Sequence, residues 1–525
     1  MTFLVLACFL LFAVRRLLTY LHIYQQEEYD SRRFLPWIIV HFAFDRRMSA
    51  VLVVLAILQF AIGVSGVIVL GAAALAFLVF AAIEKDPRKG SKKKLSLTGR
   101  AKRIYFVALG WLAVTAFAFA VTSSSIVLWI VAVQIIPMAL TIGNLLTQPY
   151  ENRLQKRFWA EAHTKLEALK PTVVGITGSY GKTSTKHLLG HILEVQAPAL
   201  ITPGSVNTPM GIARIVRERL SSHHRFFVCE MGAYGPGSIE RLCRLAPPDV
   251  AVITAIGMAH YERFKSLETV AKTKLELAEA VAKRGGPVIV AEQVLEFEAA
   301  KKFRDNYQRM IVVGTGGECE LRINASSQTT DGILAHVSWN GVSYVLRAPI
   351  FGEHHISNMA LAFAAACAVG AAPEDAIVAL ASVSQISHRL EVKQGPAGAR
   401  LIDDAYNSNP AGFASGLRLL DALSTDGGRR ILVTPGMVEL GEAHDEEHRK
   451  IGQLAGSHVD VLLAVLPERI KSFTNAYTSS NPGGTVMPFP TFTAAQTWLE
   501  SNLRSNDVVL MENDLPDLYE KKLRL

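Results

Sequence analysis

Cysteine is scarce and scattered in this 525-residue sequence. The five cysteines are odd in number and include no C-x-x-C pair: Cys8, Cys229, Cys243, Cys319 and Cys367. A disulfide framework needs paired cysteines and a structural zinc site needs closely spaced ones, so the sequence indicates neither. No internal repeat or low-complexity tract is visible either. The soluble part is therefore expected to be a reduced, cytosolic protein.

Acidic residues and lysines are missing from the long apolar runs of the first 147 residues, which cover 2–24, 49–83, 105–121 and 126–146. A transporter or proton path is therefore poorly supported. In the first run, the charged residues Arg15 and Arg16 follow the apolar stretch 2–14, whereas a signal peptide has its charges first. The run also lacks a small-residue cleavage site, so the sequence favours an anchor over a cleavable signal peptide. Run 49–83 is about twice the length of one span. The stretch Gly63–Gly66 near its middle favours two short spans over one long tilted helix, so we predict five spans.

Net charge is +8, and much of the basic surplus lies in the loop between Lys85 and Arg103. Clustered there, it indicates membrane topology rather than nucleic-acid binding. The positive-inside rule places this loop, and everything after Leu146, in the cytoplasm. The sequence thus predicts a multi-pass protein of the cell membrane, in contact with membrane lipid, with an outside N-terminus and cytoplasmic catalytic domains.

After the membrane region (1–147), the sequence predicts a connecting helix (148–170) that Pro171 ends. Strand-like runs then alternate with helical ones, which is typical of α/β units on largely parallel sheets. The predicted strands are 226–230, 249–254, 287–291, 310–314, 430–434, 459–465 and 507–511. A boundary near Ser384–His388 would give a larger domain (171–386) and a smaller, Rossmann-like C-terminal domain (387–525).

The most informative stretch begins with the β-branched run Thr172–Thr177, which predicts a buried strand. A glycine-rich loop follows, and Lys182 begins a predicted helix; the phosphate-binding residues would be Gly178, Ser179, Tyr180, Gly181, Lys182, Thr183 and Ser184. Strand, glycine loop and helix start form a phosphate cradle, with Lys182 on the terminal phosphates and the Thr183 hydroxyl on Mg²⁺. Ile176 occupies the position of the first glycine in the general P-loop pattern. The alternative is a glycine turn followed by a surface lysine.

Further stretches resemble the Mur ligase family, the ATP-dependent amide ligases that build the peptidoglycan stem peptide, and within it the D-alanyl-D-alanine-adding type. The family loop G-x-T-G-x-x-G-K-T is reproduced from Gly175 to Thr183, which accounts for Ile176. Stretches 228–233, 253–268, 271–276, 351–358, 388–391, 403–410 and 434–448 match in order and spacing. The resemblance implies the fold predicted above, with an ATP-binding central domain and a C-terminal domain.

The resemblance implies a set of metal ligands beside Thr183. Glu230 matches the glutamate that binds Mg²⁺, and a carboxylate at the end of a strand suits that role. His260 matches a histidine that helps to hold a second Mg²⁺. Lys274 matches a lysine that is carbamylated in the family and so becomes an anionic ligand. The alternatives are a solvated strand end for Glu230, a packed or surface histidine, and a solvated lysine.

The nucleotide side is also implied by the resemblance. Asn358 would lie near the base, whereas His355 stands where the family has another asparagine. Arg389 would contact the γ-phosphate and the developing acyl phosphate. The ribose and the rest of the nucleotide pocket would involve three residues of one stretch: Asp404, Tyr406 and Asn407. The expected catalytic residues are thus Lys182, His260, Lys274 and Arg389.

The implied reaction joins a carboxylate to an amine. ATP converts the carboxylate to an acyl phosphate, an amino acid or dipeptide attacks it, and phosphate leaves. Two Mg²⁺ ions and Lys182 would neutralise the transferred charge. The carboxylate substrate would be a cell-wall precursor or a related compound.

Two departures leave the substrate open. Membrane segments replace the family's UDP-sugar-binding domain, and the acidic stretch 510–517 stands where the D-alanyl-D-alanine enzyme has K-G-S-R. Three interpretations follow. The chain adds D-alanyl-D-alanine from a membrane tether, or it modifies a lipid-linked or polymeric carboxylate such as poly-γ-glutamate. The third interpretation is a membrane scaffold that binds ATP without ligase activity. Such a scaffold would not need the metal ligands, so their presence in the sequence argues against it.

Overall fold

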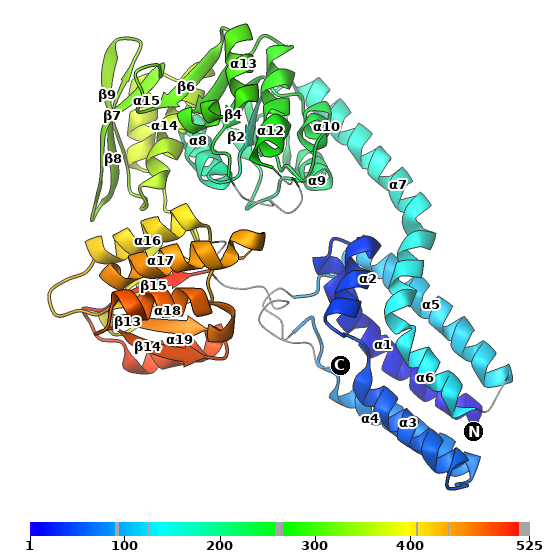
Figure 1. The fold of residues 1–525 in the computed structure, drawn as a ribbon. Helices are drawn as coiled ribbons and strands as arrows, with labels where there is room; N and C mark the ends of the chain where they lie inside the picture. Colours follow the sequence, from blue (N-terminus) through cyan, green and yellow to red (C-terminus); the bar gives the residue numbers. More distant parts are fainter. Residues whose placement is uncertain are drawn as a thin grey trace. The chain divides into compact units, whose positions relative to one another are not determined.

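The computed structural model describes residues 1–89, 94–122, 125–257, 264, 266–405, 408–438 and 440–513. The chain divides into two compact units, Met1–Lys156 and a second that begins at Arg157 and continues to the end of the described chain. The first unit is helical and the second is mixed α/β (Figure 1). The predicted class, apolar helices followed by α/β domains, is confirmed.

The helices of the first unit pack around their own apolar core. They are α1 (Thr2–Gln26), α2 (Ser31–Val40), α3 (Arg46–Phe60), α4 (Gly66–Ile83), α5 (Gly99–Thr122), α6 (Ile126–Gln134) and the start of α7 (Ile136–Leu169). The side chains of Asp30 and Asp45 accept backbone N–H groups at the starts of α2 and α3. These caps satisfy donors that a helix leaves open at its first turn.

Among the described residues, three helices are long and apolar enough to cross a membrane: α1, α4 and α5. Helices α6 and α7 meet at a 55° bend and give a fourth span only if the bent pair is one span. The sequence predicted five. The difference is α3, which has 15 residues, fewer than the roughly 20 that a span needs. Run 49–83 does form two helices and not one.

The predicted division between a last span ending at 146 and a separate connecting helix is wrong. The break comes earlier, at Ile135, and α7 then continues as one helix of 34 residues with Pro149 inside it. A proline removes one backbone donor and normally interrupts a helix. The helix ends at Leu169, before Pro171, as predicted.

An ion cluster that the sequence analysis missed lies inside the first unit. Arg16 of α1 pairs with Asp45 at 3.1 Å and with Glu84 at 3.2 Å, and the side chains are 4%, 0% and 11% exposed. The Thr19 hydroxyl donates to Glu84 at 2.6 Å. Both carboxylates stand outside the apolar runs in the sequence, at the ends of α3 and α4. The cluster therefore joins α1 to these two helices.

The second unit contains two sheets. In the larger sheet the order is β2-β3-β1-β4-β5-β6-β7-β8-β9. Its strands are β1 (Thr172–Thr177), β2 (Ala199–Ile201), β3 (Phe226–Glu230), β4 (Val250–Ile253), β5 (Val288–Ala291), β6 (Met310–Gly314), β7 (Leu321–Thr329), β8 (Gly332–Trp339) and β9 (Val342–Ala348). Pairing is parallel as far as β7, and β7–β9 form an antiparallel extension.

Helices flank the larger sheet. Figure 1 shows α8 (Lys182–Gln196) and α14 (His354–Ala368) to one side of β4, and α10 (Ser238–Leu245) and α12 (Leu267–Ala282) to the other. The remaining helices of this part are α9 (Pro209–Arg219), α13 (Glu298–Asn306) and α15 (Pro373–Ala381). Fully buried strands such as Val250–Ile253 fit this arrangement, because a parallel sheet covered on both faces needs continuous apolar runs.

The smaller sheet has the order β10-β11-β15-β12-β13-β14, parallel except for β10. Its strands are β10 (Glu391–Gln394), β11 (Arg400–Asp404), β12 (Arg430–Thr434), β13 (Val461–Val465), β14 (Thr485–Phe489) and β15 (Val508–Glu512). Its helices are α16 (Pro410–Ala422), α17 (His444–His458), α18 (Lys471–Ser480) and α19 (Phe492–Asn502). Every strand predicted from the sequence is present, with ends shifted by two residues at most.

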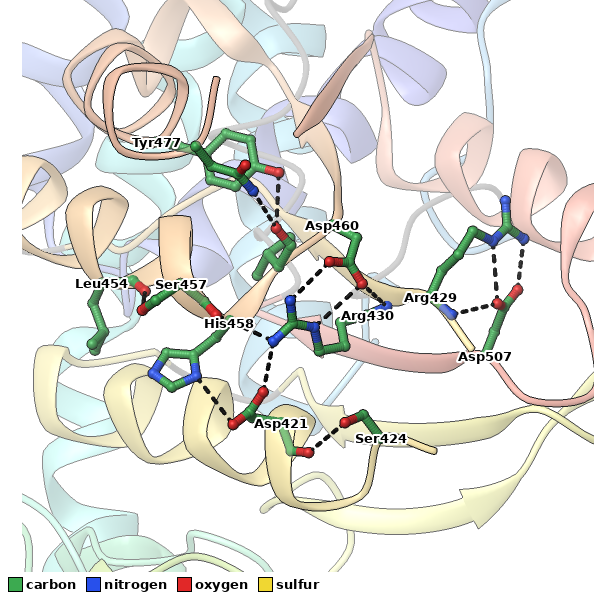
Figure 2. Close-up of polar contacts among 12 residues, drawn as sticks. Asp421, Ser424, Arg429, Arg430, Leu454, Ser457, His458, Asp460, Tyr477 and Asp507 are labelled. Carbon is green, nitrogen blue, oxygen red and sulfur yellow. Dashed lines mark hydrogen bonds and ion pairs between the residues drawn. The ribbon is translucent and has the colours of Figure 1, made fainter. Parts of the chain in front are cut away.

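Ion pairs gather at the amino ends of three strands of the smaller sheet (Figure 2). Asp507, 1% exposed, pairs with Arg429 at 2.6 Å just before β15. Arg430, the first residue of β12, pairs with Asp460 at 2.8 Å and with Asp421 at 2.6 Å. In parallel sheets, ligands bind at the carboxyl ends of the strands. These ion pairs lie at the amino ends, so we assign them a structural role in the sheet and not a role in ligand binding.

Candidate active site

The glycine loop has a backbone that requires glycine at two positions. Gly178 has φ +154° and Gly181 has φ +82°. A Cβ on Gly178 would lie 1.9 Å from the Thr254 hydroxyl oxygen, and one on Gly181 would lie 2.3 Å from the Asn358 side-chain oxygen. Both distances are far inside van der Waals contact. The loop is thus held against β4 and α14 at a separation that only glycine permits.

Ser179 ties the loop to the chain after β4. Its backbone N–H donates to the Ala255 carbonyl at 2.5 Å, and its hydroxyl accepts the Gly257 N–H at 2.9 Å. Ser184, in the first turn of α8, is buried. The α8 helix therefore begins directly behind the loop, with its N-terminal N–H groups directed toward the loop as an anion site requires.

Lys182 is the first residue of α8, and its ammonium folds back over the loop. Nζ donates to the Gly178 carbonyl at 2.6 Å and to the Ser179 carbonyl at 3.1 Å. Burial lowers the pKa of Lys182, and the Glu230 carboxylate partly restores it. The Lys182 ammonium is thus held directly over the glycine loop, where the sequence analysis expects phosphate oxygens.

Glu230, at the carboxyl end of β3, is 1% exposed and accepts three side-chain donors. Thr183 donates to Oε2 at 2.9 Å, Lys186 approaches Oε2 at 3.2 Å, and Asn207 donates to Oε1 at 3.1 Å. Register pairs Glu230 with Ile176 of β1, one residue before the strand ends. The structure thus brings the two expected metal ligands, Thr183 and Glu230, together beside the loop.

Lys186 was missed by the sequence analysis. It lies one helical turn after Lys182, is 2% exposed, and also donates to the Gly204 carbonyl. Burial lowers its pKa, while Glu230 raises it. The spacing of four from Lys182 was visible in the sequence and places the two lysines on one face of α8. Nothing in the sequence showed that this face would meet Glu230.

Lys274 of α12 reaches the loop from the other side of β1. Its side chain is 4% exposed, and it lines one small pocket together with loop and β3-end residues: Gly178, Ser179, Lys182, Asn207, Gly232, Ala233 and Tyr234. Burial holds its pKa well below the usual lysine value, and the charge of Lys182 lowers it further. A solvated lysine on a charged helix, the alternative interpretation, is excluded. His260 lies outside the described residues.

The donor set beside the loop fits Mg²⁺. This ion prefers carboxylate, hydroxyl and water oxygens and keeps several waters. Glu230 supplies a buried carboxylate and Thr183 a hydroxyl at hydrogen-bond distance from it. Lys274 in its amine form offers no oxygen, so it can join such a set only after modification.

On α14, Asn358 faces the loop. Its side-chain oxygen accepts from Thr185 at 3.3 Å, and its amide nitrogen lies 3.1 Å from Nδ1 of His355. Burial lowers the pKa of His355, and Nε2 of the ring is buried with no hydrogen-bond partner among the described residues. His355, which stands where the resemblance leads one to expect an asparagine, is therefore a neutral, buried ring.

Arg389 lies between two residues in the left-handed region, His388 (φ 59°) and Leu390 (φ 50°). Non-glycine residues are seldom found there, and two within three residues indicate a constrained backbone at this point of the chain. The charge of Arg389 is among those that lower the pKa of Lys182 and Lys186. Arg389 is thus near enough to the loop for its charge to act there.

Asp404 ends β11 and is buried. One of its oxygens accepts the Leu390 N–H at 3.3 Å, and register pairs Asp404 with Glu512 at the end of β15. Burial raises the pKa of Asp404 to about 7. The pKa of Glu512 is raised well above its usual value, mainly by burial and further by the negative charge of Asp404. Two buried carboxyls side by side share protons rather than both ionising. Tyr406 and Asn407 lie outside the described residues.

A second group of potential metal ligands is found at β10 and β11. Ligand atoms of His388, Glu391 and Asp403 lie within 4.8 Å of one another. The Lys393 ammonium already pairs with Glu391 at 2.8 Å and with Asp403 at 3.0 Å. The carboxylates are therefore neutralised by a side chain of the protein, and the group is a salt-bridge network.

Sequence profiles of two domains match the second unit. Residues 176–366 match the Mur ligase middle domain, and residues 388–512 match the Mur ligase glutamate ligase domain. Among curated relatives, the UDP-N-acetylmuramoyl-tripeptide–D-alanyl-D-alanine ligase of Bacillus subtilis is 32% identical over 291 residues, 55% of this chain and 62% of the relative. The same-named protein of Mycobacterium leprae is 31% identical over 370 residues, 65% of this chain and 70% of the relative.

Solved structures agree. MurF from Acinetobacter baumannii superposes with a TM-score of 0.59 at 26% identity, over 68% of this chain and 77% of that one. MurF ligase from Thermotoga maritima in complex with ADP gives 0.59 at 24% identity, over 69% of this chain and 80% of that one, which supports the fold alone. The chain spans about three fifths of the length of the Bacillus subtilis relative.

Proposed function

Because this chain belongs to the Mur ligase family, we propose that it is an ATP-dependent ligase that joins a carboxylate to an amine through an acyl phosphate. The observation that carries the proposal is a pocket lined by both Lys182 and Lys274. Beside it, the Thr183 hydroxyl is hydrogen-bonded to the Glu230 carboxylate. Cations, a buried carboxylate and a glycine loop converge there. Phosphoryl transfer needs this combination, because its catalysis is mostly positioning and charge stabilisation.

The glycine loop and the start of α8 would bind the phosphates of ATP. Backbone N–H groups at a helix N-terminus favour anions, and the Lys182 ammonium adds a full charge. On binding, the Lys182 ammonium would exchange its two carbonyl acceptors, Gly178 and Ser179, for phosphate oxygens. Asn358, Arg389 and Asp404, with Tyr406 and Asn407, are the proposed contacts for the rest of the nucleotide.

Thr183 and Glu230 would hold one Mg²⁺, and His260 with a modified Lys274 would hold a second. These ions would supply charge neutralisation at the transferring phosphoryl group. Lys186 pairs with the Glu230 carboxylate at 3.2 Å and orients it beside the loop.

Lys274 would act as a carbamate. A lysine with a depressed pKa is a neutral amine at ordinary pH, and its lone pair can attack carbon dioxide. The N–C bond forms, one proton leaves the nitrogen, and the product carries two oxygens and a negative charge. Burial, which destabilises the ammonium form of Lys274, thereby favours the form that reacts.

The reaction balances in two steps. A substrate carboxylate oxygen attacks the γ-phosphorus of ATP, ADP leaves, and an acyl phosphate forms. An amine then attacks the acyl carbon, the C–O bond to phosphate breaks, and the amine loses a proton. Lys182 and Arg389 would stabilise the charge on the transferring group. No nucleophilic side chain is required.

For the substrates, we propose the D-alanyl-D-alanine-adding reaction of peptidoglycan precursor synthesis. The similarity to ligases of that name over 55–65% of the chain supports it. The N-terminal unit favours a second candidate, a ligase for a lipid-linked or polymeric carboxylate such as poly-γ-glutamate. Its three or four apolar helices would then hold the protein in the cell membrane beside its substrate, with the ligase unit in the cytoplasm. A scaffold without ligase activity has no use for Lys274 in the pocket.

The test offers purified full-length protein and Mg·ATP two substrate sets and measures phosphate release and product mass. One set is UDP-linked stem tripeptide with D-alanyl-D-alanine, and the other is lipid-linked precursor with amino acids. Turnover with the first set alone establishes the D-alanyl-D-alanine reaction, and turnover with the second set alone establishes the lipid-linked candidate. Binding of Mg·ATP without turnover of either set contradicts the ligase assignment. The Lys182→Met variant is the control for contaminating ATPases.

A further inference from the structure

We propose that the first unit binds a phosphorylated membrane lipid in a pocket between α1, α5 and the loop that joins α4 to α5, with the headgroup phosphate held by Arg15, Lys89 and Lys102. The proposal goes beyond the ligase reaction. It requires that the apolar helices lie in a membrane but does not require that the second unit forms amide bonds.

The pocket is a cavity of about 630 Å³. That size lies within the range of small-molecule sites in proteins. Its walls come from three parts of the unit and combine basic, acidic and apolar side chains: Val14, Arg15, Leu18, Asp86, Arg88, Lys89, Leu97, Lys102, Tyr105 and Phe106. A hydrogen bond of 2.9 Å from the Tyr105 hydroxyl to the Val14 carbonyl holds α5 against α1 along this wall.

The charge of the pocket is positive and available to a ligand. Asp86 is its one acidic side chain, and the Arg88 guanidinium binds both Asp86 oxygens, at 2.6 Å for the shortest contact. That pair is internally neutral. Arg15, Lys89 and Lys102 are exposed and, among the described residues, take part in no ion pair. Three cations thus face one cavity whose single carboxylate, Asp86, is hydrogen-bonded to Arg88, and the net positive charge favours an anion such as a phosphate group.

Part of the lining is apolar, and exposed apolar side chains continue from it along the helices. Leu18 and Leu97 line the cavity, and Phe106, 64% exposed, stands beside them on α5. Leu11, one helical turn before Arg15 on α1, is 56% exposed. The apolar part of α5 extends from Tyr105 to Val121, away from Lys102. The pocket therefore lies where the helices change from basic to apolar.

This gradient distinguishes a lipid from a soluble anion. A nucleotide or inorganic phosphate would satisfy the three cations but would make no use of the exposed apolar side chains of Phe106 and Leu11. A lipid phosphate would satisfy the cations while its chain covers the apolar wall. Basic side chains at the cytoplasmic face of a membrane attract anionic lipid, and a concave site makes that attraction specific.

The experiment measures binding of dioleoyl phosphatidic acid to the detergent-purified full-length protein by native mass spectrometry, with dioleoylglycerol as the lipid that lacks the phosphate. The double variant Arg15→Gln/Lys102→Gln removes two pocket cations. Its matched control is Lys85→Gln/Lys94→Gln. This variant removes two exposed cations of the loop between α4 and α5 that do not line the cavity. We expect the apparent affinity to fall about fivefold for each pocket cation removed and to change little in the control. Phe106→Ala should weaken binding, and Phe117→Ala on the same helix should not.

Two outcomes overturn the proposal. Equal losses in the pocket variant and in the control would show general attraction to a basic surface. Displacement of the lipid by inorganic phosphate at equal concentration would show a site for a soluble anion. Either result leaves the ligase proposal untouched, because the substrate assay uses the other unit, and a failed ligase assay leaves this proposal standing.

Discussion

The Thr183 hydroxyl donates a hydrogen bond of 2.9 Å to Oε2 of Glu230. The two residues are 47 positions apart, on the first turn of α8 and at the end of β3. Parallel pairing of β1 with β3 brings them together, because both the loop and Glu230 follow strands that end at the same edge of the sheet. This contact is where we place Mg²⁺.

Removing the Thr183 hydroxyl should raise the Mg²⁺ requirement. We expect Thr183→Val to need more Mg²⁺ for half-maximal phosphate release, and Thr183→Ser, which keeps the hydroxyl, to resemble the unaltered protein. Glu230→Gln removes the negative charge, and we expect a loss of at least about 10²-fold in kcat, the scale for a group that stabilises transition-state charge. Activity titrated with Mg²⁺ checks all three variants. An unchanged Mg²⁺ requirement in Thr183→Val would contradict the assignment of this ligand.

Replacing Lys274 by methionine should abolish activity and stabilise the fold. In the unfolded chain Lys274 takes its usual pKa, and in the folded chain burial holds the pKa well below that. Between the two values the unfolded state binds the additional proton, so the unfolding free energy drops as pH decreases through this range. Lys274→Met removes that penalty, and we expect a gain of roughly 1–3 kcal/mol near neutral pH, from the usual cost of a buried polar group.

The measurement is thermal unfolding of both proteins without Mg²⁺ or bicarbonate, near neutral pH and at about pH 9.5, where the difference should shrink. A destabilised Lys274→Met variant at neutral pH would contradict the account of a neutral, buried amine. Lys272→Met, on the same helix but exposed, is the matched control and should change neither activity nor stability.

The Asp404–Glu512 pair should make the smaller domain less stable as pH rises. Asp404 has a pKa of about 7 in the fold, against 3.8 for a solvated aspartate side chain. Above about pH 4 the unfolded chain releases protons that the folded pair retains, so the unfolding free energy decreases until about pH 7. Glu512→Gln leaves one carboxyl, and we expect a shallower dependence. The measurement is the unfolding midpoint of both proteins at several pH values between about 4 and 7. If the midpoints of the two proteins change with pH in parallel, the shared-proton account is refuted.

Asp507→Ala should destabilise the smaller sheet strongly. The Asp507 carboxylate is buried and accepts from the Arg429 side chain and the Arg429 N–H (Figure 2). It also accepts the Arg504 N–H at 2.9 Å. Removing one partner of a buried pair costs about 3–5 kcal/mol. The Asp421 side chain is 48% exposed, and we expect Asp421→Ala to lower the unfolding free energy by less than about 1 kcal/mol. Denaturant unfolding of the two variants compares them directly, and equal losses would contradict the role given to burial.

The sequence predicted the parallel core of both sheets well. The apolar runs Thr172–Thr177 and Phe226–Glu230 were predicted as strands, and their limits agree with the structure. The predicted set did not include β2, β10, β11 and β14, nor the antiparallel extension β7–β9. Strand β7 (Leu321–Thr329) is mostly exposed and rich in polar residues, so hydrophobic periodicity gives little signal for it.

The site was predicted where one local pattern contains its residues, and missed where distant segments meet. Gly178, Ser179, Lys182 and Lys274, which the motifs singled out, line one pocket in the structure. Lys186 was missed because its role depends on Glu230, 44 residues away. The Arg16–Asp45–Glu84 cluster was missed for the same reason: each charge is ordinary in the sequence, and only the packing of α1 against α3 and α4 buries them together.

The central claim is that a substrate carboxylate is activated as an acyl phosphate, and transfer of an oxygen isotope tests it most directly. The carboxylate of whichever substrate turns over is labelled with ¹⁸O, and the released phosphate is analysed by mass spectrometry. The account predicts that one labelled oxygen appears in each phosphate released, because the bridging oxygen comes from the carboxylate and leaves with phosphorus. Phosphate without label, formed at the same rate as the amide product, would contradict it.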